Sequence, residues 1–589
     1  MIFVGRNSTG HSPPICTSCS LRLSLFSLFF SFQLFVFQLL CGSGLSALDF
    51  NSPGDPHKLA QDLLARMSDE EILAQTFMLG WVGSEPSPLV LEWVEKYHIG
   101  GIKIFGWNTE DTARLARTVG ILQGVAVASP LKIPLFVATD QEGGWIRHVK
   151  GTTSETPGNM AIGASGFPRD ALMSGYYIGR EISAIGINMN FAPSVDLFTK
   201  RDSALIGPRA FGDDPVRTAI LGAAFAKGME RSGVIATAKH YPGHGDTELD
   251  SHSVLPSIDA TESMLWEREL IPYRLLAKEG IPAVMSGHIA FPRTPAGWEP
   301  ASMSKWFLTE LLRNKLGYKG LVITDDLMMN GATMSAGSLS RAAKLALEAG
   351  NDVIMLSKTP LMDDPVWTNL LYAYKNEKAF RTRVREAALR SLTLKLDYLR
   401  RDTAPPLDPD QATLAERVPD LEGRQFFLGL AARSVTNIGT GKLPIENKQD
   451  ERILIAGQFD EFIAAGKAAY PQANSYRFSY LPFEKALPEE KAQLGRLAGD
   501  ADMVIICVAN PASLELLQSL KDLGKRVVVI SSLTPVYMEK ALWVDAAVAV
   551  YSYAKESFIA GFSAFLGSIP ATGKIPFAPR NGSVKDQGQ

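Results

Sequence analysis

Short apolar runs that alternate with charged, helical stretches are the feature that most constrains this fold. Between about residues 58 and 400 there are eight such runs, and several are apolar at successive positions. Successive apolar residues are typical of strands buried on both faces of a parallel sheet. Eight strand–helix units predict a TIM-like (β/α)8 barrel with insertions. The runs are TFMLGWV (76–82), GGIKIFG (100–106), PLFVATD (134–140), INMNFAPSVD (187–196), IATAKHYPG (235–243), AVMSGHI (283–289), LVITDDL (321–327) and DVIMLS (352–357).

Polar residues stand at the carboxyl ends of five of these runs. They are Asp140, Asp196, His240, His288 and Asp325. A (β/α)8 barrel builds its active site at the carboxyl ends of its strands. We therefore expect these side chains to meet in one site.

A proline- and aspartate-rich break, DTAPPLDPD, precedes a second region of the chain. Beyond it, four further apolar runs alternate with helical stretches, which predicts a smaller α/β sandwich domain. This region has no histidine and no polar constellation that we interpret as catalytic. The predicted parts are a signal sequence or membrane anchor (1–47), the catalytic barrel (48–400), a linker (401–425), the sandwich domain (426–580) and a tail (581–589).

The N-terminal segment is strongly apolar. No charged residue lies between Leu23 and Leu40, Arg6 and Arg22 precede this stretch, and the first acidic residue is Asp49. This pattern is typical of a secretory signal sequence. The stretch is also long enough to cross a bilayer as an anchor, and lipidation at Cys41 is a third interpretation. All three readings export the rest of the chain to the envelope, the periplasm or the medium.

Composition excludes some classes of function. The net charge is -3, and no long run of like charge suggests a nucleic-acid groove. Without the N-terminal segment, Cys507 is the only cysteine, so no internal disulfide can form. We expect a monomer.

The densest polar segment is AKHYPGHGDTELDSH, from Ala238 to His252. Its prolines and glycines exclude a continuous helix, so we expect a loop that leaves a strand. A metal site is one alternative, although the HxxxH spacing pairs its ligands only on a helix, and a self-satisfied polar loop is another. Asp250 lies two residues before His252 and could fix its tautomer and raise its pKa. The histidine would then serve as a proton shuttle.

Three further segments carry candidate residues. Asp325 ends an apolar strand in ITDDLMMNGA, and Asp326 should point the other way because side chains alternate along a strand. The pair also resembles the paired carboxylates of substrate-assisted hexosaminidases, which would leave the His252 loop without a role. Asp140, in ATDQEGGWIRHVKG, could accept two sugar hydroxyls or cap a helix. Arg209 lies in the loop IGPRAFGDD.

Together these segments resemble glycoside hydrolase family 3, in its bacterial β-N-acetylhexosaminidase branch. The likeness covers most of residues 58–580, and KHYPGHGDTELDSH is its most specific part because it is close to the KHFPGHGDTxxDSH of that branch. TDDLMM is similar to the nucleophile motif, while DQEGG and IGPRAFG follow in the order of the family. The sandwich domain is similar to the accessory domain of two-domain members. In β-glucosidase members a glutamate on that domain is the acid/base, so the loop histidine argues against that branch.

The resemblance implies a role for each matching residue. Asp325 would be the nucleophile, His252 the general acid/base and Asp250 its orienting partner. Four residues would hold the sugar, namely Asp140, Arg209, Lys239 and His240. One position departs from the family, because His148 stands where an arginine is common. Either Arg147 reaches in by a local shift or one sugar contact differs.

The resemblance implies a retaining exo-β-N-acetylglucosaminidase that needs no metal or organic cofactor. Its expected partner is an oligosaccharide of cell-wall or chitin type that contains N-acetylglucosamine. Three alternatives stay open: a glycoside phosphorylase that uses phosphate, a β-glucosidase or xylosidase of the same family, and a non-catalytic cell-wall-binding protein.

Overall fold

The computed structural model describes residues 48–203, 206–247, 254–446, 450–482 and 484–578. The predicted signal sequence or anchor, residues 1–47, lies outside this range. Within it, no helix combines the length and the apolar character that a membrane span requires.

Eight parallel strands form a closed barrel, as predicted from the eight apolar runs. Its order is β1-β10-β9-β8-β7-β6-β3-β2, and each strand lies within one of those runs. A short antiparallel hairpin, β4 with β5, follows β3 and was not predicted. The barrel strands are β1 (Phe77–Leu79), β2 (Gly101–Ile104), β3 (Phe136–Thr139), β6 (Met189–Asn190), β7 (Ile235–Tyr241), β8 (Ala283–Ser286), β9 (Leu321–Asp326) and β10 (Val353–Leu356), and the hairpin strands are β4 (Gln141–Gly143) and β5 (Ile146–Arg147).

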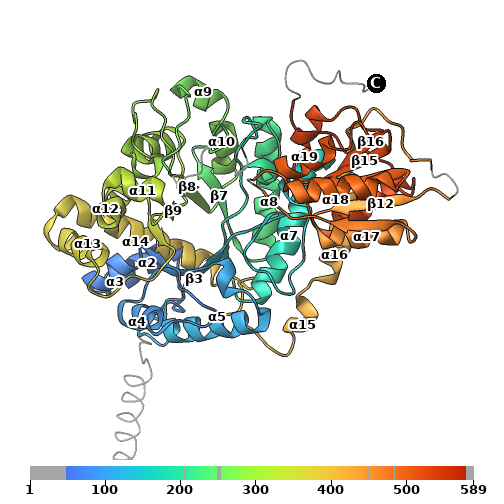
Figure 1. Ribbon diagram of the computed structural model, residues 1–589. Coiled ribbons are helices and arrows are strands. Elements are labelled where there is room, and N and C mark those ends of the chain that lie inside the picture. Colours follow the sequence, from blue (N-terminus) through green and yellow to red (C-terminus); the bar gives the residue numbers. More distant parts are fainter. Residues whose placement is uncertain (1–47, 204–205, 248–253, 447–449, 483, 579–589) are drawn as a thin grey trace, which may run out of the picture. The chain divides into compact units, whose positions relative to one another are not determined.

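Helices surround the barrel, from α2 to α14 in Figure 1. Inside it, buried side chains such as Met78, Phe136, Ile235 and Ile323 form one cluster, so the interior is a packed core. The helices are α2 (Pro56–Leu64), α3 (Asp69–Ala74), α4 (Pro88–Tyr97), α5 (Thr112–Val127), α6 (Asn159–Ser165), α7 (Pro168–Ala184), α8 (Pro215–Arg231), α9 (Glu262–Glu267), α10 (Leu270–Lys278), α11 (Asn330–Ala336), α12 (Leu339–Ala349), α13 (Pro365–Asn376) and α14 (Lys378–Tyr398), with short turns of helix at η1 (Gly106–Asn108), η2 (Gly207–Arg209) and η3 (Ala301–Met303) and a π-helix, η4 (Trp306–Lys315).

The second region is a three-layer α/β domain, coloured orange to red in Figure 1. Its sheet has the order β11-β16-β15-β14-β12-β13, and every neighbouring pair is parallel except β11 with β16. Alternate residues of the same strands pack on opposite faces: Ile455 and Ile505 lie with α16, α17 and α20, whereas Leu454 and Val504 lie with α18 and α19. The elements are α15 (Leu414–Arg417), α16 (Leu421–Ser434), β11 (Thr436–Asn437), β12 (Ile453–Gly457), α17 (Asp460–Ala469), β13 (Asn474–Arg477), α18 (Pro488–Gly499), β14 (Met503–Val508), α19 (Pro511–Gln518), β15 (Arg526–Ser531), η5 (Pro535–Lys540), β16 (Ala546–Ala549) and α20 (Lys555–Phe565).

One apolar cluster joins the second domain to the barrel loop that carries Arg209. Ile206 and Ala210 flank η2 and are buried with Tyr551 and Phe577 of the second domain. The segment Lys574–Ala578 also hydrogen-bonds along the barrel: Ala578 N donates to Asp213 Oδ2 (2.8 Å) and Asp213 N donates to the Pro576 carbonyl (3.3 Å). The second domain therefore holds the Arg209 loop from outside.

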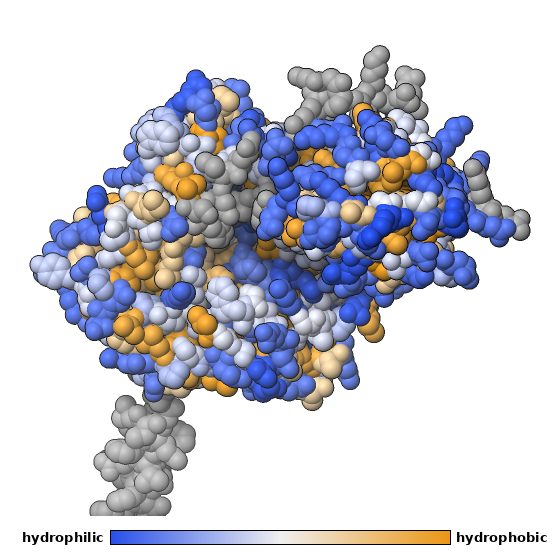
Figure 2. Space-filling view, in the orientation of Figure 1, coloured by the Kyte–Doolittle hydropathy of each residue, from blue (hydrophilic) through white to orange (hydrophobic). Residues whose placement is uncertain are grey.

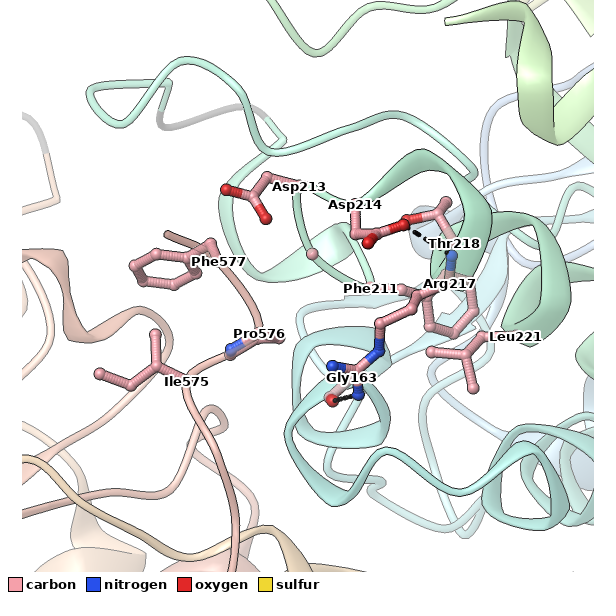
Figure 3. Close-up of a pocket in the computed structure, with 11 residues that line it drawn as sticks. Gly163, Phe211, Asp213, Asp214, Arg217, Thr218, Leu221, Ile575, Pro576 and Phe577 are labelled. Carbon is pink, nitrogen blue, oxygen red and sulfur yellow. Dashed lines mark hydrogen bonds between the residues drawn. The ribbon is translucent and has the colours of Figure 1, made fainter. Parts of the chain in front are cut away.

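A small pocket lies at this junction (Figure 3). Its volume is about 220 Å³, and Ile575, Pro576 and Phe577 face Asp213 and Arg217 across it. Gly212 is required beside it, because a Cβ there would lie 2.1 Å from the Pro576 carbonyl oxygen. None of the predicted site residues lines this pocket.

The face of the protein shown in Figure 2 is predominantly hydrophilic, with apolar residues scattered between polar ones. This surface is typical of a globular protein in water, in which single exposed apolar residues are common.

Candidate active site

The predicted sugar-binding residues gather at the carboxyl end of the barrel. Asp140 follows β3 directly, Lys239 and His240 lie in the second half of β7, Asp325 lies at the end of β9, and Arg209 ends η2. Parallel strands bring these ends to one side, so residues far apart in the sequence meet there.

Asp140 lies between two ammonium groups. Lys103 Nζ of β2 is 2.7 Å from Asp140 Oδ2, and Lys239 Nζ hydrogen-bonds to Asp140 Oδ1. Burial alone would raise the pKa of Asp140, but Lys103 and Lys239 hold it well below its usual range. The side chain is still 15% exposed. Asp140 is therefore an ionised carboxylate that a sugar hydroxyl can reach.

Glu142, in the hairpin after β3, forms a second ion-pair group with Arg209 and Lys239. Arg209 binds it in a bidentate manner, with Nε at 3.0 Å from Oε2 and Nη2 at 2.7 Å from Oε1, while Lys239 Nζ lies 2.6 Å from Oε1. Burial raises the pKa of Glu142, whereas these two cations lower it below its usual value. Lys239 thus links Glu142 to Asp140, and Arg209 is fixed beside them.

The hairpin that carries Glu142 depends on two glycines. Gly143 and Gly144 have φ of 92° and 60°, which residues with a side chain rarely adopt. A Cβ on Gly143 would lie 2.5 Å from Thr156 Oγ1. The Gly-Gly of the DQEGG motif is thus explained by the close packing of this turn.

His240 is oriented by a carboxylate. Its Nδ1 is 2.6 Å from Asp196 Oδ2, and its Nε2 is 3.4 Å from Arg209 Nη2. Because Arg209 can only donate, Nε2 accepts and Nδ1 carries the proton that Asp196 accepts. Asp196 also accepts a hydrogen bond from the backbone N–H of His244 at 2.7 Å, so it fixes both the end of β7 and the loop that follows it.

Asp325 and Asp326 differ in their surroundings. Asp326 Oδ1 accepts backbone N–H groups from Met328 (3.0 Å) and Ser357 (3.1 Å), which ties its carboxylate to the loops after β9 and β10. Burial raises the pKa of Asp326. For Asp325, burial acts in the same direction, but the surrounding groups, which include the Asp326 N–H at 2.8 Å and the Lys239 charge, outweigh it and lower the pKa. The pKa values of the two neighbouring carboxyls are therefore shifted in opposite directions.

Arg147 and His148 follow the DQEGG motif, where the sequence has a histidine in place of the arginine that is common in the family. The Arg147 guanidinium donates to the Thr153 carbonyl (2.8 Å) and to Glu155 Oε1 (3.0 Å). His148 instead has its Nδ1 at 3.2 Å from Lys103 Nζ and 3.5 Å from Asp140 Oδ2. This geometry does not support the expectation that Arg147 contacts the sugar, because its donors are turned to the hairpin and His148 stands beside Asp140.

His148 is neutral in this environment. Burial and the Lys103 charge lower the pKa of His148 to about 4. Since a lysine can only donate, Nδ1 of His148 accepts from Lys103, which leaves the proton on Nε2. His148 therefore offers one N–H donor next to Asp140.

The predicted dyad, Asp250 with His252, lies in residues 248–253, outside the described residues. The first half of its loop is described: Asp246 Oδ2 is 2.6 Å from Arg268 Nη2, and His244 is buried. Burial and His240 lower the pKa of His244 to about 4. Among the described residues, no group of three or more acidic, histidine or cysteine side chains is arranged to hold a metal ion.

Sequence reasoning missed two members of the site. Lys103 is fully buried in β2, and Glu142 lies in the DQEGG motif but was given no role. A lysine inside the otherwise apolar run GGIKIFG was the available signal, because a buried ammonium requires a charged partner. Glu142 had no comparable signal.

Comparisons with known proteins agree with this fold. The family described as "Glycosyl hydrolase family 3 N terminal domain" matches residues 70–394, and the chain belongs to this family. A "Beta-hexosaminidase A" of Pseudoalteromonas piscicida is 37% identical over 261 residues, which are 41% of this chain and 43% of that protein. The chain thus spans less than half the length of that relative.

Two further similarities extend the comparison. A "Beta-hexosaminidase" of Neisseria meningitidis serogroup A is 34% identical over 273 residues, covering 45% of this chain and 73% of the relative. The solved structure of a family 3 β-N-acetylglucosaminidase from Paenibacillus sp. str. FPU-7 has a TM-score of 0.79 at 27% identity and covers 87% of this chain and 99% of its own. The likeness therefore includes the second domain.

Proposed function

We propose that this protein is a retaining exo-β-N-acetylglucosaminidase that hydrolyses terminal β-linked N-acetylglucosamine. The assignment of the sugar is supported by relatives named β-hexosaminidase and by a β-N-acetylglucosaminidase structure of the same two-domain fold. The observation that carries the proposal is Asp325, a half-buried carboxylate at the end of a barrel strand whose pKa lies below its usual value. An ionised carboxylate at this place suits a nucleophile.

The reaction proceeds in two displacements. First, an Asp325 oxygen forms a bond to the anomeric carbon while the bond to the leaving oxygen breaks, and protonated His252 gives that oxygen a proton. Then neutral His252 takes a proton from water, the water oxygen bonds to the anomeric carbon, and the bond to Asp325 breaks. Asp250 would orient His252 and stabilise its charged form.

Asp140, Lys239 and Arg209 would bind the sugar in both steps. Asp140 accepts hydroxyl protons, whereas the two cations donate to sugar oxygens. Because Lys239 and Arg209 are already held by Glu142, these donors are in place before the substrate arrives. Such prior positioning lowers the entropic cost of reaching the transition state.

The substrate-assisted alternative is less well supported. That mechanism needs a second carboxylate on the acetamide group, and Asp326 is the only neighbour of Asp325 in sequence that could supply it. One oxygen of Asp326, Oδ1, is held by two backbone amides.

The experiment is a panel of 4-nitrophenyl glycosides assayed with and without inorganic phosphate. We expect the N-acetyl-β-glucosaminide to react at least tenfold faster than the β-glucoside and β-xyloside, without dependence on phosphate. Faster release from the glucoside would contradict the sugar assignment. A requirement for phosphate, with a sugar 1-phosphate as product, would identify a phosphorylase, and no release at all would indicate a binding protein.

We further propose that the apolar N-terminal segment exports the protein, that a cell-wall or chitin-type oligosaccharide is its substrate, and that it acts as a monomer. The charge pattern of residues 1–49 supports export. Fractionation of cells that make the full chain, followed by sedimentation of the active fraction, tests the export and the monomeric state. Activity confined to the cytoplasm, or a sedimenting dimer, would contradict them.

A further inference from the structure

Trp107 is a large exposed side chain beside the site that the proposed reaction does not use. It lies in η1, which follows β2 at the carboxyl end of the barrel, and 46% of its surface is exposed. A single exposed apolar residue needs no special explanation. Two further observations distinguish Trp107.

The first observation is that the ring is held in place. Trp107 Nε1 donates to the Trp81 carbonyl at 2.8 Å, and one face of the ring stacks on Phe105 with centroids 4.5 Å apart and planes at 8°. Asn108 fixes the same turn, because its Oδ1 accepts the Phe105 N–H at 2.8 Å. Because the Trp107 side chain is already fixed, binding a ligand to it would cost little side-chain entropy of the protein.

The second observation is a short chain of contacts from Trp107 to Asp140. Phe105, under Trp107, has Lys103 Nζ 4.3 Å from its ring centroid and the His148 ring 5.9 Å away. Lys103 in turn lies 2.7 Å from Asp140 Oδ2. Trp107 is thus the outer end of a row of side chains that begins at the proposed sugar-binding carboxylate.

We propose that the exposed part of Trp107 is a stacking surface for the sugar on the leaving-group side of the bond that is cleaved. This inference rests on the proposed function and deepens it by naming a second sugar subsite. The C–H groups of a pyranose form an apolar face that packs on an aromatic ring, while its hydroxyl groups remain in water. In an exo-acting enzyme the terminal sugar lies innermost, so the next sugar extends outward, where Trp107 lies.

The test compares two substrates that differ only on the leaving-group side. N,N′-diacetylchitobiose carries a second sugar ring, whereas methyl N-acetyl-β-glucosaminide carries a methyl group. We expect Trp107→Ala to raise the KM of chitobiose roughly tenfold, the effect of losing about one aromatic stacking contact. The kcat/KM of the methyl glycoside should change by less than about twofold, since it makes no such contact.

Conservative and control variants separate stacking from folding. Trp107→Phe keeps an aromatic face and should restore most of the chitobiose KM. Tyr372→Ala removes an exposed aromatic ring from α13, where 69% of Tyr372 is exposed, and should change neither substrate. Equal losses on both substrates, or no loss on either, would overturn the subsite. Failure of the proposed function is a different result, because the unmodified enzyme would then release N-acetylglucosamine from neither substrate.

Discussion

Two clusters of buried charge lie at opposite ends of the barrel, and they are built differently. At the amino end, Asp352 is completely buried and both of its oxygens are occupied. Oδ1 accepts from Arg383 (2.6 Å) and Arg390 (2.8 Å), and Oδ2 accepts from Arg313 (2.6 Å) and the Val322 N–H (3.0 Å). This cluster fastens α14 and η4 to the strands.

At the carboxyl end two of the carboxylates remain accessible. Asp140 faces Lys103 and Lys239 yet keeps part of its carboxylate exposed, and Asp325 is only half-buried. Perturbed pKa values alone do not separate the two ends, because Asp352 and Asp325 both have a lowered pKa. The two ends are separated by whether a ligand can reach the carboxylate. The comparison teaches that the structural carboxylate, Asp352, is fully saturated, whereas the two carboxylates proposed to contact the substrate, Asp140 and Asp325, are left partly open.

The largest expected effect distinguishes these two aspartates. Asp325→Ala should lower kcat by roughly 10⁴-fold or more, because it removes the proposed nucleophile. Its free energy of unfolding should stay within about 1 kcal/mol of the parent value. Steady-state assays and urea unfolding measure the two quantities.

The matched variant is Asp352→Asn. It should lower the free energy of unfolding by about 3 kcal/mol, since three arginines lose their common anion. The folded fraction should keep its kcat. If Asp352→Asn abolished turnover of folded protein, the distinction between the two ends would be wrong.

A second prediction concerns Lys395, which lies at the amino end with Nζ 3.0 Å from Gln75 Oε1. Burial lowers the pKa of Lys395 to about 7. Its usual pKa is about 10.4, so between pH 7 and about 10 the unfolded chain binds a proton that the folded protein does not, and stability rises with pH. Below about pH 7 both states are protonated and the contribution is constant.

Lys395→Met should remove this dependence and stabilise the protein at neutral pH by roughly 4 kcal/mol. Urea unfolding of both proteins at several pH values from 6 to 10 is the measurement. Parallel stability curves for parent and variant would show that Lys395 remains charged in the fold.

The third prediction concerns Lys103 at the carboxyl end. Lys103→Met removes a cation that keeps the pKa of Asp140 low, so that pKa should rise. We expect kcat/KM to fall about 100-fold and its acid limb to move to higher pH, because sugar binding needs ionised Asp140. Lys375→Met, which removes only a surface ion pair with Glu70, is the control. An unchanged acid limb would exclude this role of Lys103.

The smallest expected effect tests whether the second domain reaches the site through the Arg209 loop. Phe577 packs edge-on against Phe198 at 5.1 Å and belongs to the cluster that flanks Arg209. Phe577→Ala should raise KM about threefold with little change in kcat, because it loosens a loop that binds ground state and transition state alike. A double variant with Arg209→Lys should show less than the product of the two effects. Strict multiplication would show that the cluster acts on the fold alone.

Much of the barrel could be predicted from sequence because buried parallel strands consist of short apolar runs. All eight runs contain a barrel strand, and Asp140, Lys239, His240 and Asp325 lie at the predicted end. The hairpin of Gln141–Arg147 was not predictable, since its strands are short and its glycines indicate only a turn. Its folding decides that His148, rather than Arg147, stands beside Asp140.

Contacts between distant segments were beyond sequence reasoning. Glu142 binds Arg209, which lies 67 residues away in the sequence, and no local sequence pattern predicts that pair. The same holds for Trp107, whose neighbours make it a surface for binding rather than an isolated exposed ring. The roles of Asp250 and His252 stay predictions that rest on the DSH motif.

The most direct test of the central claim is covalent trapping of the nucleophile. A 5-fluoro analogue of N-acetylglucosamine with a good leaving group slows release of the glycosyl-enzyme because fluorine destabilises the oxocarbenium-like transition state. Mass spectrometry of the digested protein should then show one sugar on the peptide that contains Ile323–Ala332, with fragmentation placing it on Asp325. A label on Asp326, on any glutamate, or on no residue while turnover continues would contradict the account.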